Sequence, residues 1–335
     1  MNKSLSSLIQ STTHAKHLEK TEVIQTLWSG YGEISRYQLH DHARKSLVVK
    51  HVKLPDEHAH PLGWHSDLSH RRKVYSYQVE STWYREYSQS CSAACRVPEF
   101  LAEKQSDGET LILMEDLHAS GFSITTKHAS MTQMLACLRW LANFHATFLG
   151  SPSDGLWEVG TYWHLATRPD ELAALTDNEL KAAAKQIDQV LQDCPYQTLV
   201  HGDAKLANFC FSPYSDEVAA VDFQYVGGGC GMKDVAYFIG SCLDEDACQR
   251  YEKALLDHYF SALKLALLSK NKAMNTDKIE ASWRQLYPFA WTDFHRFVKG
   301  WNPGHWKIHG YSEGLAKQVV DSLKNGTLAK EEATR

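Results

Sequence analysis

The sequence predicts an α+β fold in which a small, β-rich amino-terminal lobe precedes a larger, mainly helical carboxy-terminal lobe. Short apolar runs bounded by turn residues, which are typical of strands, occur up to residue 117. From residue 131 onward, apolar residues recur every three or four positions, as they do in helices. With 335 residues, of which 43% are hydrophobic, the chain is long enough to form two cores. We therefore predict two domains, residues 1–115 and 116–335.

The first predicted strands form a hairpin around a glycine-rich turn. Residues 24–34 are typical of strand, turn and strand, with Gly30 and Gly32 in the turn. Glycine adopts positive φ and lets a backbone come close to phosphate oxygens, but the same G-x-G pattern also occurs in ordinary hairpins. Both interpretations stay open for this turn by itself.

A strand and a helix with isolated charges come next. Residues 46–52 predict a strand in which Lys50 stands among apolar neighbours, with Lys53 close behind. Residues 77–90 predict a helix. The intervening residues 55–70 have little periodicity, and their histidines lack the spacing of a zinc site, so they predict a polar loop.

An apolar strand over residues 111–117 ends the first lobe, and helices follow it. Residues 131–148 have apolar residues at helical spacing, and His145 lies on the apolar face. This position favours a hydrogen-bonded core histidine over a catalytic one. Further helices are predicted over residues 180–191 and after Asp244, which can cap a helix N-terminus.

Three polar residues stand at the ends of two further short strands. Asp203 and Asn208 follow the apolar residues 198–200, and Asp222 comes 19 residues after Asp203, behind another apolar run. Phosphoryl transfer needs a carboxylate that receives the alcohol proton, oxygen ligands for Mg²⁺, and a cation near the phosphate charge. Asp203 suits the first role, and Asn208 with Asp222 the second. Lys205 can supply the cation. Any one of these would be an ordinary turn residue, but the ordered set predicts phosphoryl transfer.

The same residues resemble a known group, the kinase-like small-molecule phosphotransferases that include aminoglycoside phosphotransferases, choline kinases and ecdysteroid kinase-like proteins. His201-Gly-Asp203 with Asn208 resembles the H-G-D-x-x-x-x-N loop of the group, and Asp222-Phe-Gln224 resembles its D-F-Q or D-F-E motif. Residues 234–238 resemble the D-L-A-Y-F segment of the ecdysteroid kinase-like and choline kinase-like branches. The resemblance covers about residues 25–265. It implies a two-lobed protein-kinase-like fold, and the lack of an A-P-E motif after Asp222 disfavours a protein kinase.

The resemblance also implies ATP as phosphate donor and Mg²⁺ as cofactor, bound between the lobes. Lys50 would hold the α- and β-phosphates, with Lys53 as a nearby competitor. Its acidic partner would lie on the predicted helix. Glu80 resembles the glutamate of the family's E-x-x-x-Y pattern, and Glu86 is the alternative.

Two further nucleotide contacts are implied by the resemblance. The hinge strand over residues 111–117 resembles the L-x-x-E-D-L segment, where Met114, Glu115 and Leu117 would lie beside the adenine base. Gly30 and Gly32 would then approach the phosphates.

Aromatic residues crowd into one carboxy-terminal segment, residues 283–306, where the group builds its acceptor pocket. An aromatic cage with a nearby acid would suit a quaternary ammonium alcohol through cation–π attraction, and it would also suit a flat apolar alcohol such as a steroid. The same rings could instead form helix core. Trp291, Asp293 and Trp301 are the predicted acceptor residues.

Composition excludes several other classes. The net charge of −5 argues against a nucleic-acid-binding protein. No apolar stretch reaches the roughly 18 residues of a membrane span, and the start lacks a long apolar signal core, so we expect a cytoplasmic protein. Eight scattered cysteines without a C-x-x-C pattern fit reduced thiols.

We therefore expect an ATP-dependent small-molecule kinase whose partner is a small-molecule alcohol, with no nucleic-acid or membrane partner. Asp203 and Lys205 would act in catalysis, and Asn208 and Asp222 would bind the metal. The alternatives are a catalytically silent kinase-like protein that binds a nucleotide or metabolite and, less favoured, a protein kinase. The presence of Lys50, Asp203, Asn208 and Asp222 together argues against the silent relative.

Overall fold

The structure is a computed structural model that describes residues 3–27, 30–40, 42–53, 67–106, 108–214, 216–270 and 274–326. Its contacts group the chain into two compact units. The first consists of Met1–Thr125 and Cys210–Gln224, and the second of Thr126–Phe209 and Tyr225–Arg335. This grouping differs from the predicted boundary after residue 115, because residues 116–125 and 210–224 make their contacts within the first unit.

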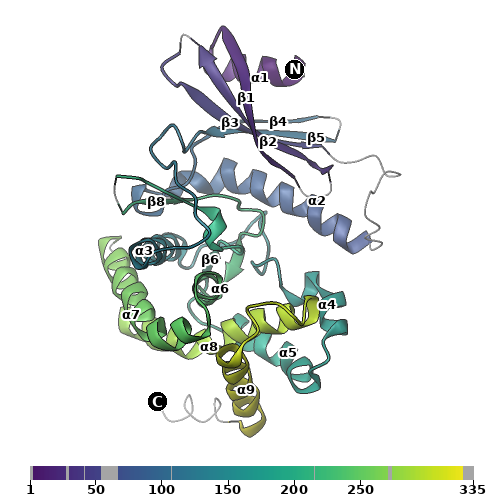
Figure 1. The fold of residues 1–335 in the computed structure, drawn as a ribbon, viewed down its shortest axis with the longest axis vertical. Coiled ribbons are helices and arrows are strands. Elements are labelled where there is room, and N and C mark those ends of the chain that lie inside the picture. Colours follow the sequence, from purple (N-terminus) through teal and green to yellow (C-terminus); the bar gives the residue numbers. More distant parts are fainter. Residues whose placement is uncertain are drawn as a thin grey trace. The chain divides into compact units, whose positions relative to one another are not determined.

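An antiparallel five-stranded sheet, with strand order β1-β2-β3-β5-β4, forms the centre of the first unit (Figure 1). The bounds of its strands are β1 His17–Thr26, β2 Gly32–His40, β3 Ser46–Lys53, β4 Phe100–Ser106 and β5 Glu109–Glu115. The register places Lys50 of β3 opposite Ile34 of β2 and Ile112 of β5. Lys50 therefore stands on the middle strand of the sheet.

In the described part of the first unit, the α-helices are α1 at Lys3–Thr13 and α2 at Asp67–Thr82. The helix predicted over residues 77–90 begins ten residues earlier than expected, and it continues as a π-helical turn at Trp83–Tyr87 and a 3₁₀ turn at Ser88–Ser90. A second 3₁₀ turn lies at Ala93–Cys95. Of the loop predicted over residues 55–70, residues 55–66 lie outside the described residues, and residues 67–70 belong to α2.

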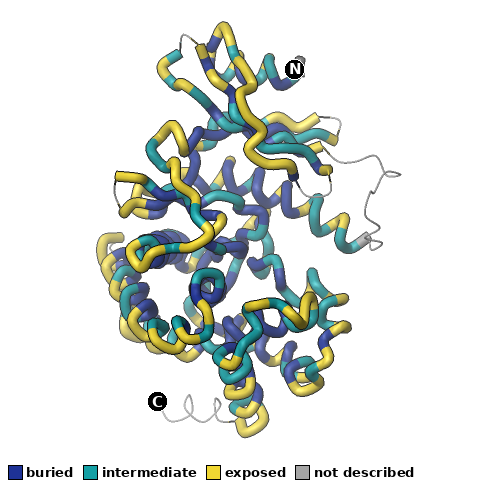
Figure 2. The backbone as a smooth tube through the Cα atoms, in the orientation of Figure 1, coloured by how far each residue is buried: buried dark blue, intermediate teal, exposed yellow. Residues whose placement is uncertain are grey.

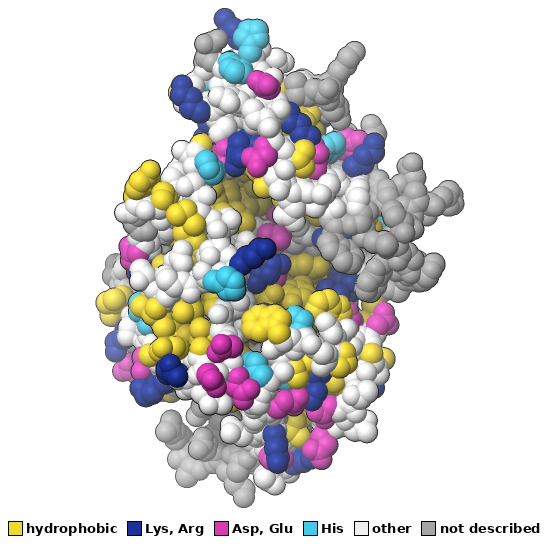
Figure 3. Space-filling view, in the orientation of Figure 1, with side chains coloured by type: hydrophobic (Ala, Val, Ile, Leu, Met, Phe, Trp, Pro, Cys, Tyr) yellow, Lys and Arg dark blue, Asp and Glu magenta, His cyan; other side chains and the backbone are white. Residues whose placement is uncertain are grey.

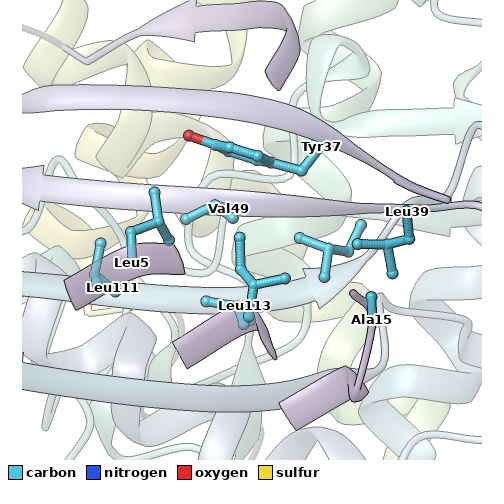
Figure 4. Packing of buried hydrophobic residues seen from close by; sticks show 9 residues of the cluster. Leu5, Ala15, Tyr37, Leu39, Val49, Leu111 and Leu113 are labelled. Atoms are coloured by element: carbon cyan, nitrogen blue, oxygen red, sulfur yellow. The ribbon is translucent and has the colours of Figure 1, made fainter. Parts of the chain in front are cut away.

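The core of the first unit lies between α1 and one face of the sheet (Figure 4). Its buried side chains come from α1, the residues after it, and three strands: Leu5, Ile9, Ala15, Tyr37, Leu39, Leu47, Val49, Leu111 and Leu113. Alternate residues of β3 and β5 point into this core, as the two-residue period of a strand requires. Lys50 lies at an intervening position of β3, so its side chain lies on the opposite face of the sheet.

The second unit is mainly helical, as predicted. Its helices are α3 Met131–Phe148, α4 Pro169–Ala174, α5 Asn178–Gln192, α6 Met232–Cys242, α7 Glu245–Ser269, α8 Thr276–Trp301 and α9 Gly310–Asn325. Short 3₁₀ turns lie at Leu165–Thr167 and Leu206–Asn208. Figure 2 shows α6 as a largely buried helix, and its residues from Met232 to Gly240 are all buried.

Local capping signals explain where two of these helices begin. Ser130 and Gln133 form a reciprocal capping box at the start of α3, which spans the predicted residues 131–148. Asp244 caps α7, because its side chain accepts a hydrogen bond from the backbone N–H of Ala247. Both predicted helix starts are confirmed.

Two small strand pairs lie outside the large sheet, one in the second unit and one almost wholly in the first. β6 (Thr198–Val200) pairs with β9 (Gly227–Gly229), and β7 (Phe209–Phe211) pairs with β8 (Val218–Ala220). The glycines of β9 allow close packing, since a Cβ on Gly227 would lie 2.2 Å from the Trp157 carbonyl oxygen. A run of glycines is typical of a turn, but here it forms a strand that pairs with β6.

The α+β prediction is confirmed, with the antiparallel sheet in the amino-terminal part and helices dominating the carboxy-terminal part. Within the described ranges, none of the helices combines the length and the apolar character that crossing a bilayer requires.

Candidate active site

The segment after β6, residues 201–208, carries three of the predicted site residues and is called the Asp203 loop below. The Lys205 ammonium lies 2.8 Å from the Asp203 Oδ2 atom. The Asn208 side chain donates from its amide nitrogen to the Asp203 backbone carbonyl at 2.8 Å and to Oδ2 at 3.1 Å. The structure therefore brings Asp203, Lys205 and Asn208 together, as the sequence predicted.

The orientation of the Asn208 amide decides which atom it can offer to a metal. Both hydrogen bonds to Asp203 use the amide nitrogen, and within the described residues no donor reaches its Oδ1 atom. An amide oxygen that accepts no hydrogen bond is a suitable ligand for Mg²⁺, which prefers oxygen ligands.

A tyrosine that the sequence analysis did not select completes the surroundings of Asp203. Tyr237 of α6 donates its hydroxyl hydrogen to Asp203 Oδ1 at 3.1 Å, and its oxygen lies 3.2 Å from the Tyr162 hydroxyl. Burial, reinforced by the Asp203 charge, raises the pKa of Tyr237 well above its ordinary value. Tyr237 therefore stays a hydrogen-bond donor that holds one carboxylate oxygen while Lys205 holds the other.

The start of the Asp203 loop is fixed by the fully buried Asp234 of α6. Its carboxylate accepts hydrogen bonds from the backbone N–H groups of His201, at 2.6 Å, and Gly202, at 2.9 Å. It also lies 3.1 Å from His145 Nε2, and His145 Nδ1 lies 2.7 Å from the Tyr259 hydroxyl. His145 is thus the hydrogen-bonded core histidine that its position predicted.

Gly202 is required by the backbone itself. Its φ is +78°, and a Cβ at this position would lie 2.0 Å from the Tyr225 carbonyl oxygen. A side chain there would displace the backbone that carries Asp203.

In the first unit, Lys50 and Glu80 form a buried ion pair. The Lys50 Nζ atom lies 2.5 Å from Glu80 Oε2, and each side chain is 2% exposed. Burial raises the pKa of the Glu80 carboxyl, although the adjacent Lys50 ammonium opposes that effect. Glu86 instead pairs with Arg85 at the surface. Of the two glutamates that the sequence left open, Glu80 is therefore the partner of Lys50.

Asp222 belongs to the same unit as this ion pair. Its Oδ1 atom lies 3.7 Å from Lys50 Nζ and accepts a hydrogen bond from the Gln224 amide at 2.8 Å. Gln224 in turn accepts a hydrogen bond from the Lys73 ammonium of α2 at 2.8 Å. The residue between them, Phe223, is buried and stacks on Trp83 with ring centroids 4.5 Å apart. This packing anchors the D-F-Q motif and orients Asp222.

The glycine turn between β1 and β2 has the conformation that glycine permits. Gly30 and Gly32 have φ of +76° and +124°, and a Cβ on Gly32 would lie 1.9 Å from the His51 carbonyl oxygen. Steric packing in the hairpin is therefore a sufficient reason for Gly32. A role in phosphate binding stays a prediction for both glycines.

The three predicted hinge residues lie at and after the end of β5, and all three are buried. Glu115 pairs with Arg96, and Phe122 donates its backbone N–H to the Leu117 carbonyl at 2.9 Å. Met114 lies within the strand, opposite Val48. The Glu115 side chain and the Leu117 carbonyl thus have partners in the protein itself, and adenine contact at this segment stays a prediction.

The three predicted acceptor residues have different surroundings. Asp293 is fully buried, accepts a hydrogen bond from the Trp163 ring N–H at 3.0 Å, and lies 2.8 Å from the Arg296 guanidinium. Burial tends to raise the pKa of Asp293, but Arg296 and Lys233 hold it below its ordinary value. An Asp293 carboxylate with these partners is already neutralised within the core.

Trp291 is also buried, edge-on to Tyr311 of α9 with ring centroids 5.1 Å apart, whereas Trp301 is 53% exposed and stacks on Phe297. A Cβ on Gly240 of α6 would lie 3.2 Å from the Trp291 ring. Trp291 therefore packs between helices, and Trp301 ends α8 at the surface.

The residues that sequence reasoning missed differ in how visible they were. Tyr237 lies three positions after Asp234, and this spacing places both residues on one face of a helix. The sequence therefore contained a signal that Tyr237 lies near the site. Gln224 stands inside a motif that was recognised without a role for its side chain. Lys307, described below, carries no sequence signal beyond following the aromatic segment.

Within the described ranges, no group of three or more histidine, cysteine or carboxylate side chains is arranged to hold a metal ion. Magnesium bound with nucleotide phosphates and water needs one or two protein oxygen ligands. Each unit, described by itself, offers one such oxygen group: Asn208 Oδ1 in the second unit and the partly exposed Asp222 carboxylate in the first.

Comparison with known proteins identifies the family. The model of the ecdysteroid kinase-like family matches residues 33–149 and 160–271, and the chain belongs to this family. This membership confirms the resemblance on which the sequence analysis relied. A search of curated proteins gave no match.

Several solved structures are similar to the chain at low identity. A microcompartment-associated aminopropanol kinase is 11% identical, with a TM-score of 0.48 over 96% of this chain and 98% of its own. An aminoglycoside phosphotransferase from Streptomyces rimosus, solved with ADP and streptomycin, is 14% identical, with a TM-score of 0.44 over 86% and 98%. A type VIII aminoglycoside-3'-phosphotransferase is 14% identical, with a TM-score of 0.39 over 86% and 98%.

Proposed function

We propose that this member of the ecdysteroid kinase-like family transfers the γ-phosphate of ATP to a hydroxyl group of a small molecule. The observation that carries the proposal is the Asp203 loop, where one carboxylate is held by Lys205, Asn208 and Tyr237. A carboxylate positioned by donors on both oxygens is suited to receive a proton from a defined direction.

In the proposed reaction, the acceptor hydroxyl oxygen attacks the γ-phosphorus, and the bond from that phosphorus to the β,γ-bridging oxygen breaks. The hydroxyl proton passes to Asp203, and ADP leaves with the bridging oxygen. Lys205 then stabilises the negative charge of the transferred phosphoryl group. The products are a phosphate monoester, ADP and a proton that Asp203 later releases.

Lys50 has the role of fixing the nucleotide phosphates, and Glu80 has the role of orienting Lys50. The 2.5 Å ion pair supports this assignment, because a buried ammonium on a central strand is held in one position by its partner. Asp222 and Asn208 would hold Mg²⁺, which when bound neutralises charge on the phosphate oxygens. Gln224 keeps the Asp222 carboxylate oriented for this task.

The test is to incubate the purified protein with ATP, Mg²⁺ and a panel of alcohols, and to search for phosphate esters and ADP by mass spectrometry. We expect a product 80 Da heavier than one alcohol, formed in proportion to ADP, and lost with a chelator or in the Asp203→Asn variant. An Asp203→Asn protein that forms the ester at the wild-type rate would refute the assigned mechanism. Nucleotide binding without ester formation on a broad panel would favour the silent relative.

A further experiment asks whether the residues of the two units serve one reaction. Lys50→Ala and Asp203→Ala should each lower kcat, and residues that act as one unit in a chemical step have effects that do not add in the double variant. We expect the double variant to be scarcely slower than the slower single one. Full additivity of the two free-energy changes would show that Lys50 and Asp203 contribute independently rather than as one unit.

A further inference from the structure

Lys307 lies in the segment between α8 and α9 and packs against an aromatic surface of the second unit. Its ammonium is 4.7 Å from the centroid of the Tyr237 ring, 5.1 Å from that of Phe294 and 5.6 Å from that of Trp306. Within the part of the chain that the structure describes, this ammonium makes no hydrogen bond and no ion pair. Among the described residues, the partners of the Lys307 ammonium are therefore rings.

Two of these rings, Tyr237 and Phe294, belong to a continuous cluster next to the candidate catalytic carboxylate. Trp163, Tyr237, Phe294, Phe297 and Val298 form its buried part. Tyr237 is shared, because its ring faces Lys307 while its hydroxyl donates to Asp203. One aromatic ring thus connects the Lys307 ammonium to the group that would receive the acceptor proton. Figure 3 shows hydrophobic side chains reaching the surface of the helical unit beside Lys, Arg and His side chains.

The charges that face Lys307 come from each element packed against it. Asp203 attracts the ammonium and Lys205 repels it, while Cys242 at the end of α6 and His305 in the same segment are the neighbouring titratable groups. Tyr237 keeps its proton, since burial raises its pKa. The pKa of Lys307 is lowered by burial to about 8, so the ammonium form still predominates at neutral pH. The charges that act on the Lys307 ammonium are therefore one carboxylate, Asp203, and one further cation, Lys205.

We propose that Lys307 selects the acceptor by pairing with an anionic group on it, so that the preferred alcohol carries a carboxylate or a similar anion and cationic amino alcohols are excluded. This inference rests on the proposed function and names the class of its substrate. The aromatic faces that would attract an ammonium ion are already occupied by the ammonium of Lys307. A partly buried cation without a carboxylate partner within ion-pair distance gains from an anionic ligand.

The experiment uses three alcohols that share a benzylic hydroxyl group and differ in charge: 4-(hydroxymethyl)benzoate, 1,4-benzenedimethanol and the trimethylammonium analogue of the benzoate. Binding to the full chain is measured by titration calorimetry with and without ADP. Wild type should bind the carboxylate about tenfold or more tightly than the ammonium analogue, because a charge-assisted pair contributes roughly 1.5–3 kcal/mol and 1.4 kcal/mol is tenfold.

Three substitutions separate charge from packing. Lys307→Met keeps the aliphatic stem on the rings and should lose the preference for the carboxylate. Lys307→Arg keeps the charge and should retain that preference. Lys307→Ala uncovers the rings and should gain affinity for the ammonium analogue. Lys317→Ala on the exposed face of α9 is the control and should bind like wild type.

A wild-type protein that binds the carboxylate no better than the ammonium analogue overturns the proposal, as does a Lys307→Met variant with unchanged preference. If Lys307 served the nucleotide phosphates instead, Lys307→Met would weaken ADP binding and leave the acceptor preference intact, which also overturns it. Because these are binding measurements, charge selectivity without phosphorylation would refute the proposed function and leave the inference standing.

Discussion

The carboxylate of Asp234 accepts a hydrogen bond from the backbone N–H of His201 at 2.6 Å, across 33 positions of the sequence. Two such N–H groups converge on it, and a buried histidine lies on the same carboxylate. Asp234 thus determines the path of the backbone just before Asp203. It is a positioning residue, since its own contacts are with the loop and the helix core.

Asp234→Ala should therefore destabilise the protein by about 3–5 kcal/mol, because it leaves two buried N–H groups and a histidine without their acceptor. Urea denaturation followed by circular dichroism measures the loss. Asp244→Ala is a matched control that removes only a helix cap, and it should cost about 1 kcal/mol. Equal losses in the two variants would show that Asp234 does no more than an ordinary cap.

Asp203→Asn should lower kcat by about 10²- to 10⁴-fold and leave ADP affinity within a factor of about two, because the amide cannot receive the acceptor proton. Steady-state kinetics with the acceptor found by mass spectrometry, together with ADP titration, checks both quantities. Asp246→Asn, at an exposed position of α7, serves as the control. A parallel loss of ADP affinity would assign Asp203 to nucleotide binding.

Glu80→Gln and Glu86→Gln form a matched pair on neighbouring turns. Glu80 is buried against Lys50, and its loss leaves the ammonium without that carboxylate, so we expect weaker ATP binding and a loss of stability of several kcal/mol. Glu86 pairs with Arg85 at the surface, and its loss should cost less than about 1 kcal/mol. Nucleotide titration and thermal melting of both proteins distinguish the two sites. Identical behaviour would remove Glu80 from the nucleotide site.

Trp291→Ala should lower the free energy of unfolding by about 3–5 kcal/mol, since the ring packs between helices and leaves a cavity. The KM values for ATP and the acceptor should then change together, if at all. The exposed Leu265→Ala is the comparison, expected within about 0.5 kcal/mol of wild type. A stable Trp291→Ala protein with a selective rise in acceptor KM would return Trp291 to the acceptor pocket.

Stability should rise with pH above about 8 through Lys307. Its pKa falls from 10.5 in the unfolded chain to about 8 in the folded protein, so the unfolded state binds more protons between these values. The penalty for burying the ammonium is present in full below this window and is relieved within it. Denaturation of wild type and Lys307→Met from pH 7 to 9.5 should show a wild-type slope that the variant lacks. Parallel profiles would contradict the lowered pKa.

Local signals predicted much of this molecule. The span of α3 followed from apolar spacing, the start of α7 from Asp244, and the buried role of His145 from its place on an apolar face. The three residues of the Asp203 loop were predicted together because they lie within six positions of one another. Short-range patterns of this kind need no knowledge of the rest of the chain.

The features that escaped prediction depend on partners far away in the sequence. The glycine run 227–229 resembles a turn until its pairing with β6 is known. Asp293 was predicted to contact the acceptor, but its carboxylate has partners within the protein. Two of them, Trp163 and Lys233, lie 130 and 60 positions before it in the sequence. No spacing rule connects Lys307 to Tyr237, although the fold places one over the other. Tertiary contact, rather than residue type, decided each of these cases.

Asp222 has a φ of +70°, a conformation that costs a non-glycine residue free energy. Glycine would adopt it without that cost, and protein kinases carry a D-F-G motif in which the glycine stands elsewhere. Substitution of Asp222 by glycine would therefore relieve the backbone strain of the folded state, but it would also remove the carboxylate. In evolutionary terms, an enzyme of this kind could lose Asp222 to glycine without any cost in backbone strain. Only continued selection for the carboxylate would then keep aspartate at residue 222.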